Sequence, residues 1–329
     1  MRSLREDLAG FLGCDADGLA FVSNATTGVN TVLRSFDWSA GDEIVVADSG
    51  YGAVLRSVQH LADRFGVVVR VARLPFPFAD LAEIVDAFRE VTHAKTRLLI
   101  VDQIVSATAV ILPVAEIVAL AHGFGVPVLV DGAHGPGQLD FSISALQAEF
   151  FTGNLHKWLC APKGSAVLYV SPAWRDRIHP LTLSHDYGKG FRAEFDWTGT
   201  ADYSAWLACG TALAHFRELG PTRVRESNHE LVRAGRVLLA EALGVELPHP
   251  DDSALYGSMA AIPFPIPAPD REALRRRMFH EERIEVPFTQ FDHRLWVRIS
   301  GQAYNHPDEY ARLAAALHRW RHEGGEVGR

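Results

Sequence analysis

Two patterns of hydrophobic residues alternate through the first two thirds of the chain. Short runs of consecutive apolar residues are typical of buried parallel strands, and segments with an apolar residue every three or four positions are typical of helices that cover a sheet. We therefore expect an α/β fold with a mostly parallel central sheet covered by helices. The expected strands are Leu19–Ser23, Glu43–Ala47, Val67–Val71, Arg97–Asp102, Val128–Asp131 and Ala166–Val170, and the expected helices are Thr27–Arg34, Ala53–Phe65, Leu81–Phe88 and Val114–Phe124.

The pattern changes after about residue 216. A long amphipathic helix is expected at Arg223–Leu243, and the Pro-rich stretch Ile262–Pro269 interrupts regular structure. Shorter segments follow, with helical spacing at Asp270–His280 and Pro307–His322 and a strand pattern at Leu295–Ser300. We therefore expect a large domain at residues 1–215 and a smaller C-terminal α/β domain at residues 216–329.

Composition narrows the class of protein. The 329 residues carry a net charge of -8, which argues against nucleic-acid or anionic-membrane partners. Three scattered cysteines are too few for a disulfide framework, so we expect a reducing, cytoplasmic setting. No apolar stretch approaches the roughly 20 residues of a membrane span, and no Cys or His cluster has zinc spacing, so neither a membrane partner nor a metal is expected.

An acid and a lysine indicate a pyridoxal phosphate (PLP) site. Asp131 ends an apolar run, and Lys157 lies between His156 and Trp158 after a Gly-containing segment. PLP chemistry needs a lysine that forms a Schiff base and an acid that keeps the pyridine nitrogen protonated. The spacing allows the acid to end one strand and the lysine to follow the next, so that both face one crevice at the sheet edge. The alternatives are a solvated turn lysine and a helix-capping acid.

Other residues fit the same cofactor. Asn24–Gly28 offers backbone N–H groups and the hydroxyls of Thr26 and Thr27 directly after a strand, as a phosphate requires. Asn154 and His156 add donors beside Lys157, and Gly199-Thr200 forms another small turn with a hydroxyl. Each of these segments, taken singly, is also common as an ordinary helix cap or turn.

Four residues are candidates for contacts around the cofactor ring and the substrate. His134 is expected to pack on the ring or contact its phenolic oxygen, and Tyr51 is expected to stack on the ring. Ser106 follows a strand from which it reaches the cofactor's O3′ atom. Arg298, on an apolar strand, is the natural clamp for a substrate carboxylate if it faces the crevice, although such a residue more often faces water.

Together these segments resemble the class V aminotransferase family of fold-type I PLP-dependent enzymes, and within it the isopenicillin N epimerase-like proteins. The matching stretches run from about residue 4 to residue 315. They are Phe21–Asn30, Val130–His134, Thr152–Trp158, Trp197–Asp202 and Arg298–Ser300 with Tyr304-Asn305. The resemblance implies a fold-type I PLP-dependent transferase-like fold and a homodimer with shared active sites.

The resemblance also implies roles for individual residues. Lys157 would carry the cofactor as its internal aldimine, with Asp131 on the pyridinium nitrogen. Thr26, the Ala25 backbone and His156 would hold the phosphate, to which the turn at Thr200 contributes from the partner subunit. The remaining matches are Tyr51 on the ring, Ser106 at a position that is often Asn, and Arg298 on the substrate carboxylate.

The reaction is not fixed by the cofactor, because PLP supplies an electron sink and the pocket selects the bond that breaks. We expect an enzyme that acts on an α-amino acid, or on a peptide with a free amino-acid end, with Lys157 removing the α-proton and epimerase-like chemistry leading. The proton donor for epimerisation would be Tyr51, His134, Cys160 or Tyr187. The alternatives are a carbon–sulfur β-lyase on a cysteine conjugate, an aminotransferase and a non-catalytic PLP-binding protein.

The start of the chain bears on these alternatives. Family members carry several dozen residues before the point that corresponds to Met1, including a Gly-containing segment of the substrate pocket. We therefore expect either a shortened sequence or a pocket built from other residues.

Overall fold

The computed structural model describes residues 1–78, 80–266 and 270–323. Contacts group them into two compact units. The first contains residues 1–75, 80–104 and 112–219, and the second contains residues 76–78, 105–111 and the described residues from Gly220 onward. The expected domain division did not assign residues 76–78 and 105–111 to the C-terminal domain. The division at residue 215 stays a prediction about which parts of the chain fold independently.

A seven-stranded sheet forms the centre of the first unit, in the order β1-β7-β6-β5-β4-β2-β3. The five strands from β3 to β6 along this order run parallel, whereas β7 pairs antiparallel with both β6 and β1. The expected mostly parallel sheet is therefore confirmed. The strands are β1 (Leu19–Val22), β2 (Glu43–Ala47), β3 (Val68–Ala72), β4 (Thr96–Asp102), β5 (Val128–Asp131), β6 (Phe150–Asn154) and β7 (Ala166–Val170).

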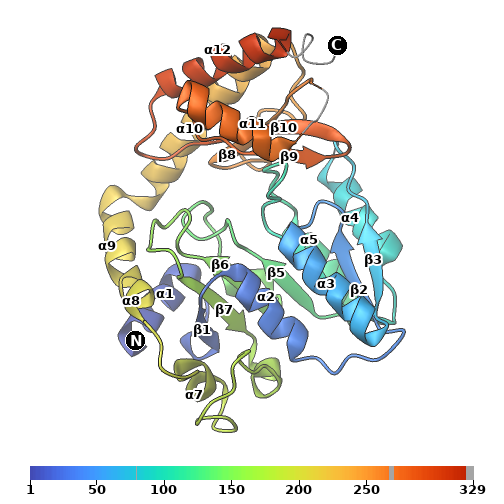
Figure 1. Cartoon of the computed structure of the whole chain (residues 1–329). Helices are drawn as coiled ribbons and strands as arrows, with labels where there is room; N and C mark the ends of the chain where they lie inside the picture. Colours follow the sequence, from blue (N-terminus) through green and yellow to red (C-terminus); the bar gives the residue numbers. More distant parts are fainter. Residues whose placement is uncertain (79, 267–269, 324–329) are drawn as a thin grey trace. The chain divides into compact units, whose positions relative to one another are not determined.

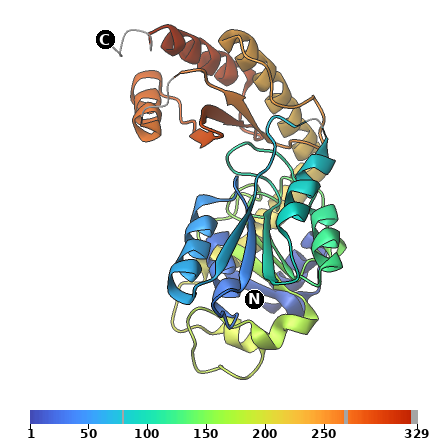
Figure 2. The same cartoon turned by 90° about the vertical axis from the view of Figure 1, so that its right-hand side faces the viewer.

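Helices cover both faces of this sheet. Figure 2 shows the blue helix α3 on one side of the strands and the teal and green helices α4 and α5 on the other. Helix α2 contacts α3, and α4 contacts α5, so each face has a layer of paired helices. The helical elements are α1 (Arg2–Leu12), η1 (Ala16–Gly18), α2 (Ala25–Arg34), α3 (Gly52–Phe65), α4 (Leu81–Val91), α5 (Val114–Gly123), α6 (Ile143–Leu146), η2 (Pro172–Arg177), α7 (Phe191–Asp196), α8 (Ser204–Leu207) and α9 (Cys209–Leu219).

The core of the first unit lies where α2 and α3 meet the sheet. Val29 and Val32 of α2 and Val58 of α3 are completely buried, together with Ile44 and Leu129 from the strands. Burial of each such side chain contributes about 1.5–3 kcal/mol relative to exposure. The periodic apolar residues of these helices therefore anchor them on the strands.

A small residue brings α2 close to the middle of the sheet. A Cβ atom at Gly28 would lie 2.1 Å from Oγ1 of Thr152 on β6, so only glycine permits this approach. The helix begins directly after β1, where the Asn24 side chain accepts a hydrogen bond from the Thr27 N–H. These two features fix the N-terminus of α2 relative to β6.

The second unit contains a three-stranded antiparallel sheet in the order β8-β10-β9. Helices α10 and α12 pack against each other, and α10 also contacts β8 and β10 (Figure 1). The elements are α10 (Pro221–Leu243), β8 (Met259–Pro263), α11 (Arg271–Arg277), the π-helical turn η3 (Met278–Glu282), β9 (Phe288–Phe291), β10 (Arg294–Ser300) and α12 (Pro307–Glu323).

The interruption expected at the Pro-rich stretch is partly wrong. Ile262 and Pro263 complete strand β8, and residues 267–269 lie outside the described part of the chain. The helix expected at Asp270–His280 ends at Arg277 and continues as a π-helical turn. Among the described residues, no helix is both long enough and apolar enough to cross a membrane.

Two glycines allow a direct test of the packing in the first unit. Gly137 and Gly41 both have a φ of +88°, which disfavours any residue with a Cβ atom. At Gly137 a Cβ atom would also lie 2.6 Å from the backbone carbonyl carbon of Trp158, whereas at Gly41 it would meet nothing within 4 Å.

We expect Gly137→Ala to lower the free energy of unfolding by about 1–2 kcal/mol through the backbone and by about 1–3 kcal/mol more through overpacking. Gly41→Ala should lower the free energy of unfolding only by the backbone contribution of about 1–2 kcal/mol. Chemical denaturation of both variants measures the difference, and equal losses would show that the close approach at Trp158 is absent.

Candidate active site

The candidate site begins at the carboxyl ends of three neighbouring strands. Asp102 of β4 pairs with Asp131 of β5, and Asp131 pairs with Thr152 of β6. Because these strands are parallel, their last residues lie at one edge of the sheet, where ligands bind in open α/β sheets. Lys157 follows β6 after two residues, so the acid and the lysine come from consecutive strands of the chain.

The acids Asp102 and Asp131 are both buried, with 7% and 3% of their surface exposed. Burial raises the pKa of Asp131, while the Ala133 N–H, which donates to its Oδ1 at 3.0 Å, opposes this rise. Burial, and then the neighbouring Asp131 carboxylate, raise the pKa of Asp102 well above its usual range. As the pH rises, Asp131 therefore loses its proton before Asp102 does.

Asp102 was missed in the sequence, although it ends its apolar run as Asp131 does. Its carboxyl accepts a hydrogen bond from the backbone N–H of Tyr51, the residue before α3. Asp102 thus links the start of α3 to the strand edge that holds Asp131.

The side chains of Lys157 and His134 are in contact. The Nζ atom of Lys157 is 3.0 Å from Nε2 of His134, and the other ring nitrogen, Nδ1, accepts a hydrogen bond from Nε1 of Trp158 at 3.1 Å. His134 is buried and Lys157 is half-buried. The Gln138 side chain donates to the His134 carbonyl at 3.0 Å and holds the loop after Asp131.

The N-terminus of α2 has the features of a phosphate site. Asn154, at the end of β6, accepts a hydrogen bond from the Ala25 N–H at 2.9 Å. Thr27 is engaged with Asn24 and Ser23, whose side-chain oxygens lie 3.1 Å and 2.8 Å from its hydroxyl. The Thr26 carbonyl accepts from the Asn30 side chain at 2.9 Å, whereas its N–H and hydroxyl have no hydrogen-bond partner among the described residues. A helix N-terminus with such a residue in its first turn suits an anion.

His156 presents one nitrogen to the protein backbone. Its Nδ1 lies 2.7 Å from the Ser165 carbonyl oxygen, so Nδ1 carries a proton and donates. Burial lowers the pKa of His156, although this hydrogen bond opposes the fall. A second proton on Nε2 would be needed for His156 to donate to a phosphate.

Two of the expected cofactor residues are open to solvent in the first unit. Tyr51 is 43% exposed. Thr200 is exposed on the turn after α7, where the hydroxyl of Tyr203 donates to the Gly199 carbonyl at 3.2 Å. The structure brings Asp131, His134 and Lys157 to one sheet edge and leaves Thr200 on the surface.

Ser106 and Arg298 belong to the second unit and contact each other. Nη1 of Arg298 lies 2.5 Å from the Ser106 carbonyl oxygen and 3.0 Å from its Oγ atom. Strand β10 supplies Arg298, and Thr289 of β9 donates to the neighbouring Ala107 carbonyl at 2.8 Å. Ser106, which was expected to reach the cofactor, is thus a hydrogen-bond partner of Arg298.

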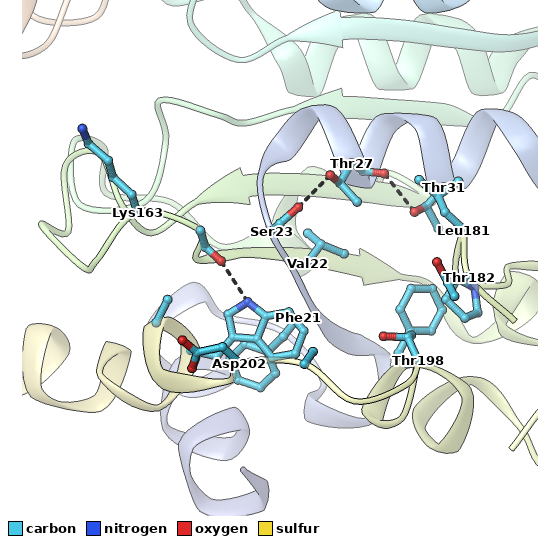
Figure 3. Close-up of a pocket in the computed structure, with 16 residues that line it drawn as sticks. Phe21, Val22, Ser23, Thr27, Thr31, Lys163, Leu181, Thr182, Thr198 and Asp202 are labelled. Atoms are coloured by element: carbon cyan, nitrogen blue, oxygen red, sulfur yellow. Dashed lines mark hydrogen bonds between the residues drawn. The ribbon is translucent and has the colours of Figure 1, made fainter. Parts of the chain in front are cut away.

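A cavity of about 460 Å³ lies beside the start of α2 in the first unit. Figure 3 shows hydroxyl groups on one part of its wall, where Ser23 contacts Thr27 and Thr31 donates to the Thr27 carbonyl. Phe21 and Trp206, which stack at 5.6 Å, line another part. Thr198 and Asp202, which flank the Thr200 turn, also reach this cavity.

The chain is similar to known proteins along most of its length. The family model described as aminotransferase class-V matches residues 1–275. An isopenicillin N epimerase from Streptomyces clavuligerus is 36% identical, with 95% of this chain and 82% of the relative covered. A probable chloroplastic L-cysteine desulfhydrase from Arabidopsis thaliana is 33% identical, with 92% and 70% covered.

Solved structures share the fold. A variant of C-DES with glycine covalently linked to its PLP cofactor has a TM-score of 0.78 and 24% identity, with 96% of this chain and 84% of that chain covered. This likeness confirms the fold-type I architecture, and the family indicates pyridoxal 5′-phosphate as the cofactor. A buried acid, a lysine and a helix N-terminus at one sheet edge fit this group.

The buried Asp102 predicts how stability depends on pH. Because the pKa of Asp102 is higher in the folded protein than in the unfolded chain, the folded state binds more protons between these two values. Stability should therefore fall as the pH rises through this window. Asp102→Asn keeps an acceptor for the Tyr51 N–H but removes the charge, so it should raise the melting temperature at neutral pH and flatten this decline.

Thermal unfolding at a series of pH values checks this expectation. Asp86→Asn, which removes a carboxylate that is 66% exposed on α4, serves as the control and should leave the decline in place. An Asp102→Asn variant with the wild-type pH profile would show that Asp102 is solvated.

Proposed function

This chain belongs to the class-V aminotransferase family, and we propose that it is a PLP-dependent enzyme that acts on an α-amino acid or on a peptide with a free amino-acid end. The observation that carries this proposal is the contact between Lys157 and His134 at the sheet edge where Asp131 is buried. PLP, when bound, supplies an electron sink that stabilises negative charge at the substrate α-carbon.

We assign Asp131 to the pyridine nitrogen of the cofactor. A buried carboxylate that ionises before its neighbour Asp102 provides a fixed negative charge at the strand edge. A negative charge in a buried site favours a bound proton on an adjacent nitrogen. Asp131 thereby keeps that nitrogen protonated, and the Ala133 N–H holds the carboxylate in place.

The Thr26 N–H and hydroxyl supply donors for the cofactor phosphate at the start of α2, whereas the Ala25 N–H already donates to Asn154. Asn154 supports them, because it fixes the Ala25 N–H at 2.9 Å and so holds the helix terminus against β6. His156 joins this group when it binds a proton on Nε2, and a phosphate dianion favours that protonation.

Lys157 serves as the residue that binds the cofactor and then as the general base that moves the substrate α-proton. A nucleophilic and basic lysine must be uncharged. In the second unit, the Arg298 guanidinium is the group that binds the substrate carboxylate, with the Ser106 oxygens orienting it.

Epimerisation is the first candidate reaction, on the strength of the 36% identity to an isopenicillin N epimerase. It requires a proton donor on the face opposite Lys157. Three of the four expected donors are exposed, namely Tyr51, Cys160 and Tyr187, and the fourth, His134, contacts Lys157 itself.

That arrangement favours β-elimination as the second candidate. A carbon–sulfur lyase needs one base for the α-proton and loses its sulfur substituent from the β-carbon, so it needs no donor on the opposite face. The 33% identity to a probable L-cysteine desulfhydrase supports this alternative.

We also propose that the protein is a homodimer in a reducing, cytoplasmic setting. Residues 181–207 expose an unusual set of large apolar side chains, which indicates a protein interface. They are Leu181, Leu183, Tyr187, Trp197 and Leu207. Thr200 lies within the same segment, so a partner subunit on this surface would cover it. Cys14, Cys160 and Cys209, which all lie in the described part of the chain, form no disulfide.

Two lysines near β6 provide a matched test of the base. Lys157→Ala should lower α-proton exchange of amino acids in deuterated water by at least about a thousandfold, because the group that accepts the proton is lost. Lys163→Ala removes an exposed lysine from the loop that follows Lys157, and it should keep exchange near the wild-type rate. Proton NMR of the substrates measures both.

The same assay separates the two candidate reactions. Exchange with inversion of the α-carbon supports epimerisation, whereas pyruvate and sulfide released from L-cysteine support elimination. Wild-type exchange by Lys157→Ala would remove Lys157 from the proposal.

The carboxylate site is tested on strand β10. Arg298→Ala should raise the KM for amino acids about 10–100-fold, since a hydrogen bond between charged groups contributes about 1.5–3 kcal/mol. Arg294→Ala changes an exposed arginine on the same strand and should leave the KM unchanged. Equal KM values for wild type and Arg298→Ala would contradict this assignment.

A further inference from the structure

Two consecutive residues contact the two nitrogens of one imidazole ring. Lys157 contacts Nε2 of His134 at 3.0 Å, and Trp158 contacts Nδ1 at 3.1 Å. Trp158 and His134 are 9% and 8% exposed, so water does not compete for these positions. The ring is therefore enclosed between the residue that the proposed function makes the base and the residue that follows it.

The direction of the Trp158 hydrogen bond determines where His134 carries its proton. An indole nitrogen has a hydrogen to donate and no lone pair to accept with, so Nδ1 of His134 must be the acceptor. A neutral imidazole has one N–H group, which then lies on Nε2. That N–H faces the Lys157 Nζ atom, which accepts it only with the lone pair of an uncharged amine.

The opposite arrangement conflicts with Trp158. A charged Lys157 ammonium would donate to Nε2, and this would require the His134 proton on Nδ1. Two N–H groups, from Nδ1 and from the indole, would then face each other in a buried place, at the cost of both hydrogen bonds. Trp158 thus disfavours a charged Lys157 through the His134 ring.

A tight turn holds Lys157 and Trp158 in position. The Cys160 N–H donates to the Lys157 carbonyl at 3.2 Å, and the Ala161 N–H donates to the Leu155 carbonyl at 3.1 Å. Gly137 packs on the backbone of Trp158, where a Cβ atom would come within 2.6 Å. The directions of both side chains therefore follow from the backbone.

We propose that Trp158 is a positioning residue that fixes His134 as the Nε2–H tautomer and so keeps Lys157 as an uncharged, nucleophilic amine. This inference rests on the proposed role of Lys157 as the residue that binds PLP. Trp158 acts through His134. It determines which nitrogen of the His134 ring carries the proton before any cofactor binds.

The tautomer is measured directly in the protein without cofactor. In protein labelled with ¹⁵N-histidine, NMR should show the His134 proton on Nε2, with the signal assigned by its loss in His134→Gln. Trp158→Phe keeps the aromatic packing but removes the donor, and should shift the ratio of tautomers toward Nδ1–H by about tenfold, as the loss of one hydrogen bond implies. Trp38→Phe, which removes an indole donor to the Leu33 carbonyl, is the control and should leave His134 unchanged.

The rate at which PLP attaches to the protein gives a second readout. In Trp158→Phe the rate should fall about tenfold at pH 7 and recover at higher pH, where Lys157 loses its proton without help. A purely structural role would lower the rate equally at every pH. Either that result or a wild-type His134 with its proton on Nδ1 would overturn the proposal, and the tautomer assignment does not depend on catalysis by Lys157.

Discussion

The parallel register of β4, β5 and β6 is the constraint on which the candidate site depends. It places Asp102, Asp131 and Thr152 side by side at one sheet edge. A shift of one residue in this register would turn Asp131 to the other face of the sheet. The apolar residues that precede each acid fix the register, because they are buried from both faces.

Burial at this edge gives two aspartates in equivalent strand positions different pKa values. Asp102 and Asp131 are both carboxylic acids at strand ends, yet the low polarity of the site and their mutual repulsion separate their ionisation. Asp131 has the Ala133 N–H of its own loop, whereas Asp102 has the N–H at the start of α3. The surrounding backbone therefore decides which acid is available to a cofactor.

Much of the fold followed from the sequence, because apolar runs and helical spacing report burial directly. Strand β5 begins and ends where expected. The bounds of β6 do not follow from the sequence, because Gly153 and Asn154 are residues that strands disfavour. The place of this segment between β5 and β7 makes it a strand. The pairing of Ser106 with Arg298 was also missed, because it joins residues far apart in the chain and leaves no local pattern.

The sequence indicates residues for the candidate site, which stay predictions, but it does not indicate their proton positions. Lys157, Asp131 and His134 have chemistry that can be read from residue type and spacing. The role of Trp158 depends on which nitrogen of a distant ring its indole reaches, and the sequence carries no sign of that. Trp158 donates to His134 and His134 contacts Lys157, so in the proposed arrangement the charge of the lysine depends on all three side chains. The proposed arrangement opposes the effect of Asp131, which ends the neighbouring strand and whose negative charge favours an ammonium at Lys157.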